Sequence, residues 1–150
     1  MNIIVKVAGV VFDSENKILL IKEKYREADG YKWNLIKGTF DHADETLDDC
    51  LRREIKEEVG LVAGQISLRK IFQYGTPDQI KLLFVFYVHN CTGEVSIPDS
   101  RSAVAGEDIQ ESAWFTQKDI MAMAPDSFIA SYVSKSLSAR EDGQVDIERL

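Results

Sequence analysis

The feature that most constrains this chain is an amphipathic helix predicted for Thr46–Val59. Thr46 suits the N-cap, and Asp49, three residues on, stands in a capping-box position. Gly60 suits the residue just past the last turn, where a left-handed backbone is common. The sequence therefore defines both ends of the helix, and its apolar stripe has to be buried against other elements.

Three glutamates of this helix do not lie where a solvated run of charges would lie. At about 100° per residue, the apolar arc contains Leu47, Cys50, Leu51, Ile55 and Val59. Glu54 and Glu58 fall inside this arc, and Glu57 falls at its edge. Buried carboxylates are costly unless cations offset their charge. The pattern indicates a Mg²⁺ or Mn²⁺ site; the alternative is a partly exposed rim with salt bridges to Arg53 and to loop lysines.

The composition bounds the classes of protein that remain. A chain of 150 residues, 45% hydrophobic and 29% charged, fits one globular domain, which we place at residues 1–140, with a mobile tail at 141–150. The formal net charge of −7 argues against general nucleic-acid binding. The two cysteines are far apart, which argues against a disulfide framework or a cysteine zinc site. With no recognisable signal peptide and no apolar run of membrane-spanning length, a cytoplasmic protein that does not enter the membrane is expected.

Strand and helix patterns alternate in a mixed order along the chain. Strands are predicted at Ile3–Phe12, Lys17–Lys22, Trp33–Ile36, Ser67–Tyr74, Lys81–His89 and Ser112–Phe115. Glu23–Lys32 is polar and is predicted to be a loop, whereas Thr116–Met123 and Ser127–Arg140 are predicted to be helical. Such an order favours an α/β (α+β) fold in which a mixed β-sheet lies between helices.

The stretch Arg52–Leu61, RREIKEEVGL, resembles the core of the Nudix box. The matching residues are Arg53, Glu54, Ile55, Glu57, Glu58, Gly60 and Leu61, with Glu45 at the family's distance upstream. The resemblance extends from Val5 to about Met123, through the opening strands, the approach KWNLIKGTFDHADE and the later ESAWFTQKDI. It implies the Nudix (MutT-like) hydrolase fold, an α/β/α sandwich.

The resemblance also implies an activity and a site. Nudix enzymes use Mg²⁺ or Mn²⁺ to cleave the pyrophosphate bond of a nucleoside diphosphate linked to another moiety. By position, the implied metal ligands are Glu54, Glu57, Glu58 and a backbone carbonyl of Gly38, and the implied catalytic set is Glu54, Arg53 and Glu57. Glu54 would lie near the attacking water, Arg53 would hold the glutamates in place, and Glu45 would brace the loop. Glu107 is similar in position to an additional acid that some members use.

Two positions depart from the family pattern. Thr39 stands where the family has a glycine six residues before Glu45, and Asp44 replaces another usual glycine. Either the loop carries a one-residue insertion, or Gly38 is the first of a normal pair. The departures keep open an alternative in which the domain binds a nucleotide or a protein without catalysis. Members of the family often pair, so a homodimer also stays open, although no stretch of this chain points to one.

Nothing in the box selects the small-molecule diphosphate substrate. Basic residues that flank the predicted site could meet outer phosphates or lie in solvent: Lys22, Lys24, Arg26 and Lys37. Aromatic residues that could stack on a base or belong to the core are Trp33, Phe40, Phe72 and Tyr74. The substrate-binding residues therefore remain unassigned from the sequence.

Overall fold

The computed structural model describes residues 1–26, 30–97 and 109–150. The strands in this part of the chain are β1 (Asn2–Val11), β2 (Ile18–Arg26), β3 (Gly30–Asn34), β4 (Ile36–Thr39), β5 (Gln65–Thr76), β6 (Gln79–His89), β7 (Ile109–Phe115) and β8 (Asp146–Arg149). The helices are α1 (Leu47–Val59), α2 (Gln117–Ala122), α3 (Tyr132–Lys135) and the 3-10 helix η1 (Pro125–Ser127). None of the helices described is long and apolar enough to cross a membrane.

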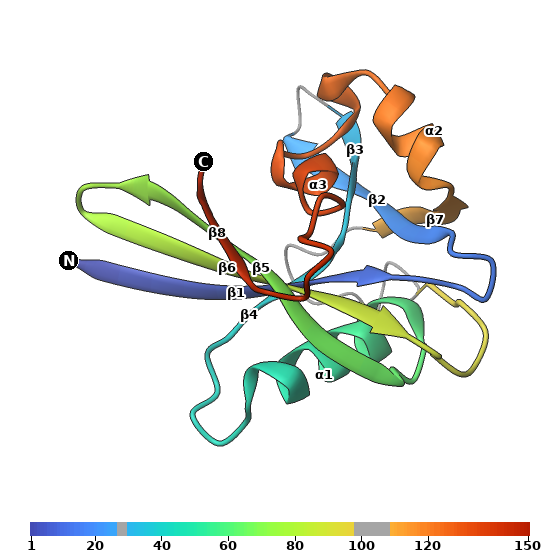
Figure 1. Cartoon of the computed structure of the whole chain (residues 1–150), viewed down its shortest axis with the longest axis horizontal. Helices are drawn as coiled ribbons and strands as arrows, with labels where there is room; N and C mark the ends of the chain where they lie inside the picture. Colours follow the sequence, from blue (N-terminus) through green and yellow to red (C-terminus); the bar gives the residue numbers. More distant parts are fainter. Residues whose placement is uncertain (27–29, 98–108) are drawn as a thin grey trace.

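The strands form two sheets. The larger sheet has the order β4-β1-β6-β5-β8, with β1 parallel to β6 and antiparallel to β4. The smaller sheet has the order β3-β2-β7 and is antiparallel throughout. Figure 1 shows α1 on one side of the larger sheet and the smaller sheet, α2 and α3 on the other. The predicted mixed α/β/α arrangement is confirmed, with the strands divided between two sheets.

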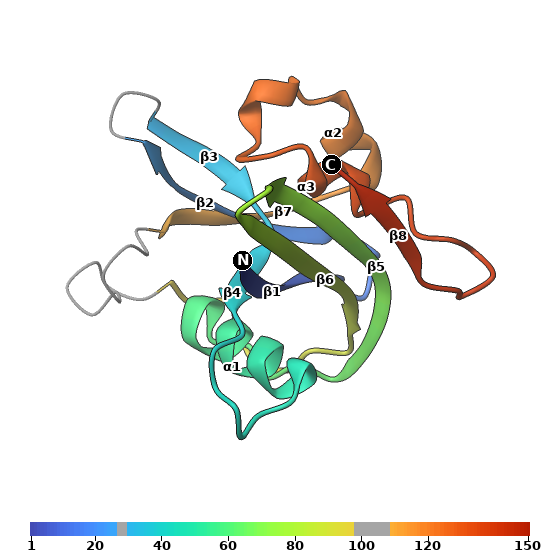
Figure 2. The same cartoon turned by 90° about the vertical axis from the view of Figure 1, so that its left-hand side faces the viewer.

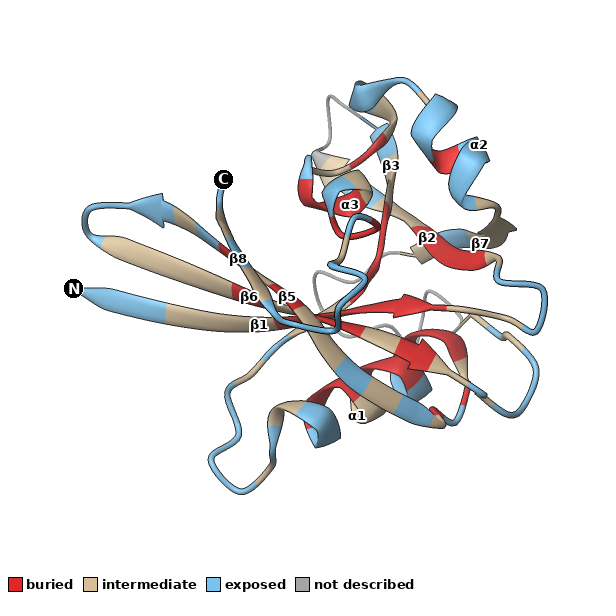
Figure 3. Ribbon diagram, in the orientation of Figure 1, coloured by how far each residue is buried: buried red, intermediate tan, exposed pale blue. Residues whose placement is uncertain are grey.

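The alternation of side chains along β1 separates two hydrophobic clusters. Val7 and Val11 pack in a cluster with the apolar stripe of α1, whereas Ala8 and Val10 pack in a cluster with α3. Figure 3 shows the resulting buried strip along the middle strands and the inner face of α1. The central sheet is therefore covered on both faces, and α1 is held firmly against it.

Helix α1 begins and ends where the sequence predicts. Thr46 Oγ1 accepts a hydrogen bond from the Asp49 amide at 3.2 Å, and the Asp49 carboxylate accepts one from the Thr46 amide at 3.4 Å. Gly60 follows the last turn with φ of 75°, a left-handed conformation that glycine adopts without a steric cost. The helix predicted for Thr116–Met123 also forms, as α2, with Thr116 as its N-cap.

The predicted helix Ser127–Arg140 is largely wrong. The amide of Ile129 donates to the Trp33 carbonyl at 2.9 Å, and Phe128 forms a bridge with Trp33, so the chain is extended where the helix should begin. Further on, Ser136 Oγ donates to the Tyr132 carbonyl at 2.6 Å, a local bond that competes with helical pairing. Only the short helix α3 forms. The predicted loop Glu23–Lys32 also differs, because β2 runs on to Arg26 and β3 begins at Gly30.

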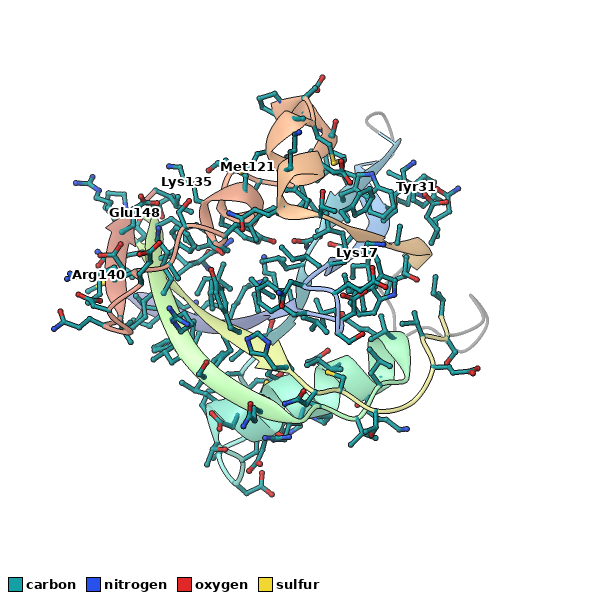
Figure 4. The ribbon with its side chains drawn as sticks, turned by 45° about the vertical axis from the view of Figure 1, so that its right-hand side comes forward. Lys17, Tyr31, Met121, Lys135, Arg140 and Glu148 are labelled. Atoms are coloured by element: carbon teal, nitrogen blue, oxygen red, sulfur yellow. The ribbon has the colours of Figure 1, made fainter. Side chains whose placement is uncertain are left out.

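The segment predicted to be a mobile tail instead ends in a strand. β8 pairs in parallel with β5, from Lys70 opposite Asp146 to Gln73 opposite Arg149, and Figure 2 shows the two strands side by side at the sheet edge. Glu148 lies 3.8 Å from Lys135 Nζ of α3, a pair labelled in Figure 4. Backbone pairing, rather than burial, holds this strand, since Ile147 is 71% exposed.

Candidate active site

The helix α1 carries two carboxylates into the protein interior. Glu54 is 6% exposed and Glu58 is 4% exposed, whereas Asp49 and Lys56 on the opposite face of the helix are exposed. The side chain of Glu57 is 48% exposed, at the margin of the buried arc. The helical periodicity therefore predicted the directions of all three side chains correctly. The alternative of a partly exposed rim describes Glu57, which is near Arg53, but not the buried Glu54 and Glu58.

Arg53 joins the acidic residues of the box. Its guanidinium donates twice to the Glu45 carboxylate, at 2.8 and 3.3 Å, in a bidentate pair. Its Nη1 atom donates to Glu54 Oε1 at 3.1 Å and lies 3.5 Å from Glu57 Oε2. The hydrogen bond with Glu45 raises the pKa of Arg53, and the same bond lowers the pKa of Glu45. Arg53 thus fixes the relative positions of three carboxylates that would otherwise repel one another.

Gly38 on β4 permits a close approach to α1. A Cβ atom built on this residue would collide with Glu54 Cγ and Cδ, so a side chain there would have to displace Glu54. Gly38 pairs with Val7 in an unbroken β1–β4 register that also includes Thr39 opposite Lys6. Neither Thr39 nor Asp44 is among the described non-glycine residues with positive φ. The two replaced glycines therefore leave the backbone unstrained, and the register shows no insertion within β4.

Cys50 lies beneath this group of charges. Its thiol donates to the Thr39 carbonyl at 3.7 Å, and Arg53 Nη2 lies at the same distance from its sulfur. Burial and the nearby Glu45 carboxylate raise the pKa of this thiol to about 12. Cys50 is a small packing residue here, since a thiol with so high a pKa is a poor nucleophile and a poor metal ligand at neutral pH.

The donor set suits a hard divalent cation. Carboxylates of Glu54 and Glu58 and the backbone of Gly38 supply the oxygen ligands that Mg²⁺ and Mn²⁺ prefer. As the side chains stand, no three acidic, histidine or cysteine side chains of the described residues converge on one point. Glu54 and Glu57 both turn toward Arg53 Nη1 instead. Since the Glu57 side chain is half exposed, it can turn away from Arg53 at little cost.

A cleft of about 520 Å³ opens next to this group. The described residues that line it are Lys6, Glu23, Tyr25, Asn34, Lys37, Gly38, Thr39, Glu58, Tyr74, Lys81, Ile129, Ala130, Tyr132 and Leu150. Of the sequence candidates for substrate contact, Lys37 and Tyr74 lie in the cleft. Lys22 and Trp33 do not; they pack against each other, with the ammonium 5.4 Å from the ring centroid. Glu107 lies outside the described residues.

A buried polar network forms one wall of the cleft. Tyr132 and Asn34 are each 2% exposed, and the Tyr132 hydroxyl donates to Asn34 Oδ1 at 2.5 Å. The Asn34 amide donates to Glu23 Oε1 at 2.7 Å, and Lys37 Nζ donates to the Tyr132 hydroxyl at 3.3 Å. Sequence reasoning missed Asn34 and Tyr132. They are 98 residues apart in the sequence, and no local sequence pattern predicts their hydrogen bond.

Comparison with known proteins assigns this arrangement to a family. Residues 3–135 match the family model described as NUDIX domain. The chain belongs to the Nudix family. It is 32% identical over 128 residues to an ADP-ribose pyrophosphatase of Methanocaldococcus jannaschii, covering 81% of this chain and 67% of that protein. It is 33% identical over 75 residues to an 8-oxo-dGTP diphosphatase of Haemophilus influenzae, covering 50% of this chain and 48% of that protein.

The fold agrees with this assignment. A MutT Nudix hydrolase from Burkholderia pseudomallei superposes with a TM-score of 0.71 at 20% identity, covering 91% of this chain and 97% of that one. An 8-oxo-dGDP phosphatase of Danio rerio is 26% identical over 78% of this Nudix chain, which spans about a third (33%) of that longer protein. The predicted enzyme class, a Nudix pyrophosphohydrolase, is confirmed.

Proposed function

We propose that this Nudix enzyme uses Mg²⁺ or Mn²⁺ to hydrolyse the pyrophosphate bond of a nucleoside diphosphate linked to another moiety. The observation that carries the proposal is the burial of two carboxylates, Glu54 and Glu58, beside the glycine of β4, Gly38. Buried carboxylates are costly unless a cation offsets their charge, and Glu58 and Gly38 line the 520 Å³ cleft, which supports a role in binding a cation next to a substrate.

In this proposal Glu54, Glu57, Glu58 and the Gly38 carbonyl hold the metal. When bound, the divalent cation screens the phosphate charges, lowers the pKa of a water ligand and stabilises the leaving oxygen. The acidic character of the cluster supports this role, because carboxylate oxygens are the ligands that a hard divalent cation prefers. Glu57 would leave its contact with Arg53 Nη1, now 3.5 Å long, to join the ligand set.

The protein's own groups orient the reaction. Arg53 holds Glu54 by its Nη1 atom and is itself fixed by the bidentate pair with Glu45. Glu54, held in place by Arg53, is the carboxylate that would accept the proton of the attacking water. Glu45 contacts only Arg53 among these groups, so we assign it a positioning role. Catalysis in this scheme consists mostly of positioning and charge stabilisation.

The relatives suggest which substrates to test first. One is an ADP-ribose pyrophosphatase and another an 8-oxo-dGTP diphosphatase, so a nucleotide sugar and a nucleoside triphosphate are both candidates. The panel should contain ADP-ribose, other nucleotide sugars and modified and unmodified nucleoside triphosphates, each with Mg²⁺ or Mn²⁺.

The test compares the wild type with Glu57→Gln across this panel. Removing one ligand should lower kcat/KM by several orders of magnitude, because stabilisation of the transition state falls by several kcal/mol. Glu141→Gln, an exposed residue near the end of the chain, is the matched control and should act as the wild type. A Mn²⁺ titration followed by calorimetry supplies a readout that does not need turnover. If the wild type cleaves nothing and binds no Mn²⁺, the proposal is wrong and the binding-module alternative stands.

A further inference from the structure

Three lysines from three different strands meet on one face of the larger sheet. Lys6 of β1 is the middle one: Lys37 of β4 is paired with Ala8, and Lys81 of β6 is paired with Ile4. Ile4, Lys6 and Ala8 are every second residue of β1, so their side chains point to the same face of the sheet. Lys37 and Lys81, which are paired with Ala8 and Ile4, are therefore diagonal neighbours of Lys6 on that face. All three line the cleft of the candidate active site. We name Lys6, Lys37 and Lys81 the lysine row.

The lysine row is electrostatically costly. Burial and the charge of Lys81 lower the pKa of Lys6, and the charge of Glu23 opposes them. The chain has 25 acidic and 18 basic residues, so such a gathering of positive charge runs against its overall balance. Like charges on neighbouring strands destabilise a sheet, which makes the row a candidate for a binding function.

Aromatic and acidic groups surround the lysines of the row. Lys37 Nζ donates to the Tyr132 hydroxyl and lies 4.8 Å from the centroid of the same ring. Lys81 Nζ lies 5.8 Å from the centroid of Tyr74. Two carboxylates, Glu23 and Glu58, face the row; the first accepts a hydrogen bond from Asn34, and the second is a proposed metal ligand. Among the described side chains that line the cleft, three carry an ammonium group and two carry a carboxylate.

This chemistry selects the kind of group that the cleft receives. A lysine ammonium has three donors and no acceptor, so a ligand must present acceptors to all three side chains. Only an anionic group both accepts several such bonds and offsets the repulsion within the row. The volume of about 520 Å³ is sufficient for a small charged moiety.

We infer that the lysine row is a subsite for an anionic group, a phosphate or a carboxylate, on the part of the substrate beyond the cleaved pyrophosphate bond. The inference rests on the proposed function, and it narrows the substrate class to diphosphates whose attached moiety carries further negative charge. Tyr132 is a positioning residue in this subsite, since its hydroxyl and its ring orient Lys37.

The first experiment measures charge selectivity with matched substrates. UDP-glucuronate and UDP-glucose differ by a carboxylate, and GTP and GDP differ by a third phosphate. The ratio of kcat/KM within at least one pair should favour the more anionic member by about 10-fold or more, because a charge-assisted hydrogen bond contributes at least as much as the roughly 1.4 kcal/mol that corresponds to this factor. The pair that shows the preference identifies the anionic group as a carboxylate or a phosphate.

Substitutions then test whether the lysine row causes the preference for the more anionic substrate. Lys6→Gln/Lys81→Gln should reduce the ratio within the preferred pair to near one, while Lys118→Gln, an exposed lysine of α2, should leave it unchanged. Tyr132→Phe keeps the ring but removes the hydroxyl, and should reduce the ratio by a smaller factor. Thermal unfolding checks the fold: removing like charges should leave the double variant at least as stable as the wild type, so a loss of selectivity cannot be blamed on unfolding.

A binding experiment separates this inference from the proposed function. Inorganic tripolyphosphate is titrated calorimetrically into the wild type and the double variant in the presence of a chelator, so that neither turnover nor metal contributes. Binding should be at least 10-fold weaker in the double variant. If this holds while no substrate is hydrolysed, the hydrolase proposal fails and the subsite stands. If hydrolysis occurs with no preference in either pair, and tripolyphosphate binding is equal in both proteins, the subsite is refuted and the hydrolase proposal stands.

Discussion

The two ends of the active site draw their residues from the chain in different ways. The box end comes from one short stretch: Gly38, Glu45, Arg53, Glu54, Glu57 and Glu58. The cleft end comes from four strands and a helix: Lys6, Asn34, Lys37, Lys81 and Tyr132. At the box end the contacts form within α1, the loop before it and the adjacent strand β4, whereas at the cleft end they form only once the sheets and the C-terminal segment have assembled. A change at the box end should therefore act on chemistry, and a change at the cleft end on selectivity.

The largest effect on the box end is expected for Gly38→Ala. The added Cβ would collide with Glu54, which is buried and cannot move freely, so we expect a loss of about 1–3 kcal/mol in the free energy of unfolding. Displacing Glu54 should also lower kcat by about 100-fold, since misplacement by about 1 Å is enough for that. Urea denaturation and steady-state kinetics measure the two quantities.

The control for this variant is Gly143→Ala. Gly143 has φ of 79° and no atoms within 4 Å of the site of a Cβ, so alanine there costs only backbone strain, about 1–2 kcal/mol. The two variants should lose similar stability, but only Gly38→Ala should lose activity. Equal activities in the two proteins would mean that the close contact between β4 and α1 has no part in catalysis.

Adjacent arginines give the next comparison. Arg53 contacts the box carboxylates, whereas Arg52 donates to the carbonyls of Ala63 and Gly64 at 2.7 and 2.9 Å. Lysine keeps the charge but loses the planar fork in either position. Arg53→Lys should lower kcat/KM by about 10–100-fold, the usual cost of losing a group that orients metal ligands. Arg52→Lys should lower the free energy of unfolding by roughly 1–3 kcal/mol and leave kcat/KM within about threefold. If both variants lost activity equally, the proposal that Arg53 positions the box carboxylates would be wrong.

The same contrast explains what could be predicted from the sequence. The caps of α1, the inward direction of Glu54 and Glu58 and the mixed sheet between helices follow from patterns within a few residues, because helix periodicity and capping are local. Asn34 and Tyr132 could not be found this way, since their contact joins residues 98 apart. One signal was present: Lys6 interrupts the β-branched run of β1 on the face that Ala8 and Val10 bury. A charged residue on the apolar face of a strand indicates a possible binding site, as it does on the apolar face of a helix.

The helix predicted in the C-terminal segment was wrong for a related reason. The helix predicted for Ser127–Arg140 rested on periodicity alone, yet Ile129 bonds to β3 and Phe128 is buried against it. A mobile tail was predicted at residues 141–150, whereas residues 146–149 pair as a strand with the sheet edge that β5 provides. Edge pairing depends on a distant partner and leaves little trace in the pairing strand's own sequence.

The smallest expected effect concerns this edge. The amide of Leu150 donates to the Gln73 carbonyl at 2.9 Å, and β8 pairs over four residues with β5. Short edge strands open easily, so protection from hydrogen exchange should be modest, about 10-fold or more above that of the turn at residues 141–144. Exchange followed by mass spectrometry on C-terminal peptides measures this difference. If the amides of Asp146–Leu150 exchanged as fast as those of the turn, the predicted mobile tail would be correct. Leu150 would then not form a stable part of the cleft wall.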